Sequence, residues 1–141
     1  MRMRKIAFVG AALCALGQPA FAKTITVTPG AGAQERLQEA LIAAEPGDVV
    51  ELEAGRFALT DGLSLDVNKV TLKGQNAKDS VLDFSAQQGS GEGLLVTSDD
   101  VILRDFAVEN SKGDGIKSKG ADRIVYHKIR VEWTGGPKAT N

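Results

Sequence analysis

The spacing of apolar residues changes once along this chain and divides it into two kinds of structure. Near the start, apolar residues recur at intervals of three and four, the spacing of one helix face: Leu37, Ala40, Leu41 and Ala44. Pro46-Gly47 is expected to end this helix. Before it, Ile25 and Val27 alternate with threonines, which predicts a short strand. After it, short runs of Val, Leu and Ile are separated by Gly, Asp, Asn and Ser, so the rest is predicted to be β.

The β part repeats a pattern of three short strands. The first strand of each repeat has a glycine, an apolar residue, any residue, an apolar or small residue and a polar one, at residues 62–66, 93–97 and 115–119. The second strand follows at 70–73, 101–104 and 124–127, and the third at 82–84, 106–108 and 129–131. Three turns of three strands can therefore be stacked on one another.

The length of the repeat favours a coil. The opening glycines are 31 and 22 residues apart, and a loop at residues 73–81 accounts for most of the longer step. A period near 22 is too short for a propeller blade of about 40 to 45 residues and lacks the asparagine signature of leucine-rich repeats. It fits turns stacked at the parallel-strand spacing of about 4.8 Å. Strand alternation then predicts inward side chains at Leu63, Leu65, Val70, Leu72, Leu94, Val96, Val101, Leu103, Phe106, Val108, Ile116, Ile124, Ile129 and Val131.

Residues 37–57 indicate a family. They join the helix, with Leu41-Ile42-Ala43-Ala44, to Pro46-Gly47-Asp48-Val49-Val50 and then to Gly55-Arg56-Phe57. This stretch resembles the start of right-handed parallel β-helix proteins of the pectin lyase-like superfamily, and the repeats extend the resemblance over residues 24–133. It implies an all-β solenoid, a right-handed parallel β-helix with an N-terminal capping helix. The superfamily includes lyases, hydrolases, epimerases and binding proteins, so the resemblance predicts fold rather than function.

Residues 1–22 have the pattern of a secretory signal peptide. Arg2, Arg4 and Lys5 precede an apolar stretch from Ile6 to Leu16, and Ala20-Phe21-Ala22 forms a small-x-small cleavage site. Eleven apolar residues are too few to span a bilayer, which needs about 20, so a transmembrane anchor is the weaker alternative. We expect cleavage near Ala22 and export to the periplasm or beyond the cell.

The rest of the chain then divides into a strand and capping helix at 23–48, coil turns at 49–134, and a flexible end at 135–141. No second cap is found in the sequence, although the last turn of a solenoid would otherwise expose its apolar columns. We therefore expect an incomplete domain, either a fragment or a natural short form. A piece that does not fold alone is a further possibility.

Composition after cleavage excludes several kinds of chemistry. The only cysteine, Cys14, lies in the signal peptide, so disulfides and thiol chemistry are not expected. Removing three of the 17 basic residues leaves 14 against 18 acidic ones, a net charge of −4. Nucleic acid is therefore not an expected partner. The sequence does not indicate an oligomeric state.

Outward cations are the candidate binding residues. Lys73, Arg104 and His127 occupy equivalent positions of the second strands, and Lys117 and Lys119 belong to a first strand. Stacked turns would present them at regular spacing to the carboxylates of an acidic polysaccharide, since charge-assisted hydrogen bonds to carboxylates are strong. The alternative is an ordinary solvated sheet face.

Catalytic and metal-binding roles are weaker expectations. A lyase acting on uronates needs a base and a cation that stabilises the enolate, and Lys117, Lys119 or Arg104 could be the base only with a strongly lowered pKa. No cofactor is evident and no metal ligand is assigned. Calcium is possible in a full-length protein, with four aspartates available as ligands, although carboxylates in turns often just cap the backbone: Asp99, Asp100, Asp105 and Asp114.

Two further motifs have competing interpretations. Asp114-Gly115-Ile116 resembles the Asp-Gly-Ile of polygalacturonate hydrolases, but Lys117 stands where those enzymes have a second Asp, so Asp114 is expected to be a turn residue. Trp133 and Tyr126 could form a sugar-stacking platform, or Tyr126 could point inward while Trp133 covers a corner. The favoured function is an exported protein that binds or modifies a polysaccharide. The alternative is a non-catalytic surface or envelope protein.

Overall fold

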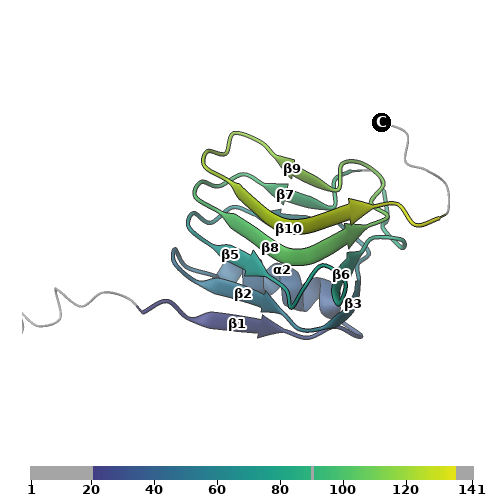
Figure 1. The fold of residues 1–141 in the computed structure, drawn as a ribbon, viewed down its shortest axis with the longest axis horizontal. Helices are drawn as coiled ribbons and strands as arrows, with labels where there is room; N and C mark the ends of the chain where they lie inside the picture. The colour runs from purple at the N-terminus through teal and green to yellow at the C-terminus, as the bar shows by residue number, and fades with distance from the viewer. Residues whose placement is uncertain (1–20, 90, 136–141) are drawn as a thin grey trace, which may run out of the picture.

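The chain forms a stack of short parallel strands that wind around one apolar core. A computed structural model describes residues 21–89 and 91–135, so most of the predicted signal peptide and residues 136–141 of the predicted flexible end lie outside the described residues. Figure 1 shows the turns stacked from β1 to β10. The elements are β1 (Thr24–Val27), α2 (Ala33–Ala43), β2 (Val49–Leu52), β3 (Gly55–Ala58), β4 (Leu63–Leu65), β5 (Thr71–Lys73), β6 (Ser80–Asp83), β7 (Leu94–Val96), β8 (Ile102–Glu109), β9 (Ile116–Ser118) and β10 (Val125–Glu132).

The stacked strands make three faces, and each pairing between them is parallel. The first face consists of β4, β7 and β9. The second face consists of β1, β2, β5 and the first halves of β8 and β10, and the third face of β3, β6 and the second halves. β8 and β10 serve two faces because Asp105 and Lys128 adopt left-handed conformations, with φ of 59° and 54°, and bend the strands there. The predicted second and third strands are thus continuous in these turns.

The predicted inward columns form the core. Ten of the fourteen predicted residues are fully or almost fully buried, from Leu63 to Val108. Ile116, Ile124 and Ile129 are partly buried against them. Val131 departs from the prediction because it is 40% exposed. It lies on β10, which pairs only with β8, so no described strand stacks on its other edge.

The first two repeat glycines, Gly62 and Gly93, stand where neighbouring turns approach backbone to backbone. A Cβ at Gly62 would lie 2.7 Å from the carbonyl oxygen of Glu92, and one at Gly93 would lie 2.7 Å from that of Gly115. These distances are too short for any side chain. The repeat glycine is therefore a packing requirement of the stack.

Helix α2 lies at the lower end of the stack, where it contacts β1, β3 and β4. Leu37, Ala40 and Leu41 of the predicted apolar face are buried. The side chain of Gln38 accepts a hydrogen bond from Ser64 N at 2.9 Å and donates one to Ser64 O at 3.0 Å. In a sheet, a neighbouring strand would form hydrogen bonds with the backbone N–H and C=O of this edge. The Gln38 amide forms them at Ser64 instead, so it caps the edge of β4. Within the described residues, no helix is long and apolar enough to cross a membrane.

Candidate functional site

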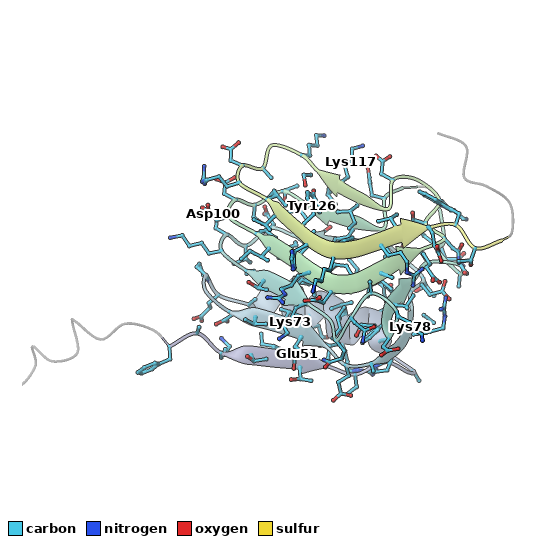
Figure 2. The ribbon with its side chains drawn as sticks, viewed as in Figure 1. Glu51, Lys73, Lys78, Asp100, Lys117 and Tyr126 are labelled. Carbon is cyan, nitrogen blue, oxygen red and sulfur yellow. The ribbon has the colours of Figure 1, made fainter. Side chains whose placement is uncertain are left out.

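Three of the predicted binding residues lie in one column on the second face. The register places Glu51, Lys73, Arg104 and His127 on successive strands from β2 to β10. Figure 2 shows Lys73 directly above Glu51. Lys73 Nζ lies 3.3 Å from Glu51 Oε2, and Arg104 Nε donates to Asp105 Oδ2 at 2.6 Å. The column is therefore present, but two of its cations already have acidic partners.

An apolar column runs beside the charged one. Thr71, Ile102 and Val125 stand two positions before Lys73, Arg104 and His127 on the same strands, so they project from the same face. Ile102 and Val125 are exposed. We call these two columns the second-face strip: Thr71, Lys73, Ile102, Arg104, Val125 and His127. It combines cations with aliphatic surface, which is suited to sugars that carry both carboxylates and C–H faces.

Lys117 and Lys119 lie apart from this strip. Lys117 is on β9 of the first face, in register with Leu95, as predicted. Its Nζ bonds to Glu92 Oε1 at 3.0 Å and lies 3.6 Å from Asp114 Oδ2. The hydrogen bond to Glu92 raises the pKa of the Lys117 amino group above its usual range. Lys117 therefore does not meet the requirement for a general base, whose pKa would have to fall.

The four candidate calcium ligands each have a partner within the protein. Asp99 Oδ1 accepts a hydrogen bond from the backbone of Asp122 at 2.9 Å. Asp100 Oδ1 accepts one from Arg123 at 2.6 Å, and this bond holds the pKa of the Asp100 carboxyl below its usual range. Asp105 and Asp114 pair with Arg104 and Lys117. No group of three metal-ligating side chains occurs within residues 21–89 and 91–135.

The two aromatic residues do not form a shared platform. Tyr126 lies near the start of β10 and Trp133 directly follows the end of this strand, with the bend at Lys128 between them. Tyr126 continues the inward column of Leu72 and Leu103, and its hydroxyl hydrogen-bonds to that of Ser118 across the end of the coil. It is nevertheless 50% exposed. Trp133 Nε1 donates to Ser111 O at 2.7 Å at a corner.

The third face carries a charged cluster that the repeat pattern alone did not predict. Glu109 is 4% exposed and accepts hydrogen bonds from Arg56 and Arg130, the latter at 2.9 Å. Burial raises the pKa of the Glu109 carboxyl, but the two arginines outweigh this effect and hold the pKa below its usual range. Arg56 also bonds to Asp83, and Arg130 to Glu132. The sequence contains a pattern that indicates the acidic part of this cluster, because acidic residues occupy the same position in three successive turns: Asp83, Glu109 and Glu132.

A hollow of about 590 Å³ lies at the lower end of the second face. Its lining includes Thr26, Gln75 and two glutamates, Glu51 and Glu53. Carboxylates would repel the carboxylates of a uronate chain. An acidic ligand would thus be favoured higher on the face, at Lys73 and above.

No family model matches the chain, and no curated protein sequence matches it. Solved structures that are similar include the PL6 family alginate lyase AlyGC, at 22% identity and a TM-score of 0.61 over 78% of this chain. A point mutant of the same lyase matches at 18% identity and a TM-score of 0.52 over 79% of this chain. The chain spans 16% and 19% of the lengths of these two structures. At such identities the likeness shows the fold alone, a parallel β-helix. The right-handed winding stays a prediction, favoured by the general rule for parallel crossovers.

Proposed function

We propose that this chain is part of an exported parallel β-helix protein that binds or modifies an acidic polysaccharide, with the second-face strip as its contact surface. The observation that carries the proposal is the register of Lys73, Arg104 and His127 on adjacent strands. The similarity of the fold to an alginate lyase supports the same substrate class, because alginate is a polymer of uronates.

The strip is suited to weak, repeated binding. Its cations are about 4.8 Å apart along the stack, so a chain lying across the strands would meet one cation per turn. Glu51 and Asp105 compete with the ligand for Lys73 and Arg104. Each contact therefore contributes little, as for exposed ion pairs generally, and binding should weaken in salt.

A modifying activity of the lyase type would need more than this strip. Arg104 can stabilise the negative charge that develops on a uronate when its proton is removed. Lys117 does not supply the base, because its pKa is raised. A non-catalytic glycan-binding or surface protein is the second candidate, favoured by the acidic partners that Lys73, Arg104 and Lys117 already have.

Binding to alginate, polygalacturonate and neutral dextran tests the contact surface. We expect Lys73→Gln and Arg104→Gln each to weaken alginate binding about two- to fivefold, as expected for exposed ion pairs. Lys78→Gln is the matched control, because Lys78 is exposed on the loop between β5 and β6 and Figure 2 shows it apart from Lys73. Equal losses in all three variants, or equal binding to dextran, would contradict the proposed surface.

Incubation with the same uronates separates the two candidates. Unsaturated products, new reducing ends or epimerised sugars would show modification. Salt-sensitive binding without any of these products would favour the non-catalytic protein.

A further inference from the structure

The coil begins at Lys23. The backbone oxygen of this residue accepts a hydrogen bond from Val49 N at 2.9 Å, and its backbone nitrogen donates to Asp48 Oδ1 at 3.0 Å. Thr24, the next residue, pairs with Val49 as the first residue of β1. The two residues before Lys23 are exposed, Phe21 to 90%. The boundary between exposed chain and coil therefore falls between Ala22 and Lys23.

Asp48 is a buried carboxylate that binds Lys23, the first residue of the coil. It is 2% exposed, and its Oδ2 accepts from Glu45 N at 2.8 Å and lies 2.9 Å from Lys23 Nζ. Backbone hydrogen bonds from Lys23 and Glu45, together with the Lys23 side chain, lower the pKa of the Asp48 carboxyl from 3.8 to about 2. Asp48 is thus ionised at neutral pH and aimed at the first residue of the coil.

The expected cleavage site coincides with this boundary. The small-x-small motif Ala20-Phe21-Ala22 directs hydrolysis to the bond between Ala22 and Lys23. Water supplies a hydroxyl to the carbonyl carbon of Ala22 and a proton to the nitrogen of Lys23. The products are an Ala22 carboxylate and a Lys23 α-amine, which is protonated at neutral pH.

We propose that Asp48 is the receptor for the α-ammonium group that cleavage creates at Lys23, so that removal of the leader strengthens the closure of the first turn of the coil. The nitrogen that becomes charged is the one already 3.0 Å from Asp48 Oδ1. Asp48 is ionised, so cleavage replaces a neutral amide donor by a cationic one and turns this hydrogen bond into an ion pair. The inference depends on leader cleavage and is independent of glycan binding.

The new ammonium group gives this contact a characteristic pH dependence. The charged groups that face it are the Asp48 carboxylate, the Lys23 side-chain ammonium on the other carboxylate oxygen, and Glu45 nearby. Pairing with Asp48 raises the pKa of the α-amine above its ordinary value of about 8. The added stability is therefore fully present below about pH 8 and is lost as the pH rises through the higher folded value.

Two chains that end at Asn141 test the proposal. One begins at Lys23. The other begins at Phe21, so its α-ammonium group lies two residues away from Lys23, in the exposed segment. Intact mass of the exported protein should show a chain that begins at Lys23. Urea unfolding at about pH 6 should give the Lys23 chain a folding equilibrium constant about tenfold larger, the effect of a one-unit rise in the pKa of its amine. At about pH 11 the difference should disappear.

Asp48→Asn in both chains provides the control. It should remove the difference between them at about pH 6, because the amide cannot form the ion pair. A different mature N-terminus, or an equal stability of the two unsubstituted chains at about pH 6, would overturn the proposal. If Asp48→Asn prevents folding, the pH dependence of the difference between the unsubstituted chains decides alone.

Discussion

Glu109 shows how the third face stabilises a charge that the stack buries. Its carboxylate is almost fully enclosed, and Arg56 and Arg130 reach it from turns below and above. Glu109→Gln keeps the shape but loses the charge. We expect a loss of about 2 kcal/mol in the free energy of unfolding, within the range for hydrogen bonds to charged groups. Urea unfolding followed by circular dichroism measures it.

Glu132→Gln is the matched control for Glu109. Glu132 occupies the same column and also bonds to Arg130, but its side chain is half exposed. It should cost less than about 1 kcal/mol, as exposed ion pairs do. Equal losses in the two variants would mean that burial does not strengthen the Glu109 contacts.

Gly93 tests the packing of neighbouring turns at a single atom. A methyl group there would lie 2.7 Å from Gly115 O and 3.0 Å from the ring of Phe84. Gly93→Ala is therefore expected to lower the free energy of unfolding by about 1 to 3 kcal/mol, the cost of overpacking. Ser64→Ala is the control, since Ser64 is exposed on the adjacent strand of the first face. Thermal unfolding would show the difference, and an unchanged midpoint for Gly93→Ala would contradict the close stacking.

At the scale of elements, α2 replaces a missing strand. Gln38 bonds to both backbone groups of Ser64 on the lower edge of β4. Gln38→Ala should lower the free energy of unfolding by about 1 to 2 kcal/mol, since each net hydrogen bond contributes about 1 kcal/mol. Glu39→Ala, an exposed position on the same helix, is the control. Faster amide exchange of Ser64 in the Gln38 variant alone would locate the effect at the edge.

Local periodicity predicted the elements whose boundaries are set locally. The helix face from Leu37 to Leu41 and the inward columns have spacings of 3.6 and 2 residues, and the structure confirms both. The continuity of β8 and β10 was missed because Asp105 and Lys128, and not glycines, take the left-handed bends. Polar residues in such a position look like the end of a strand.

The candidate site was predicted only in part because partners come from other turns. The repeat pattern predicted that Lys73, Arg104 and His127 lie in one column, and the strand register confirms it. It did not place Glu51 below Lys73, because residues 49–52 were not identified as a strand of the same column. The partner of Lys117 at Glu92 lies outside any repeat strand, so no periodic pattern could reveal it.

For the whole molecule, the free energy of unfolding is expected to fall in acid, because ionised carboxylates bond neighbouring turns to one another. The pKa is lowered for six of them, namely Asp48, Asp83, Glu92, Asp100, Asp105 and Glu109. Several bonds join residues in different turns, as between Asp100 and Arg123 and between Glu92 and Lys117. Because the folded pKa values lie below the unfolded ones, this stability is present above about pH 4.5 and is lost as the pH falls through the folded values.

The urea midpoint should therefore stay nearly level from about pH 7 to 5 and fall steeply between about pH 4 and 2, where the unfolded chain binds more protons than the coil. Asp100→Asn should lower the midpoint at neutral pH and flatten the fall, since the tie to Arg123 is already weakened before any proton binds. Asp61→Asn is the control, because Asp61 is exposed and makes no ion pair within the described residues. A midpoint that stays level down to about pH 3 would mean that the apolar columns alone hold the turns together.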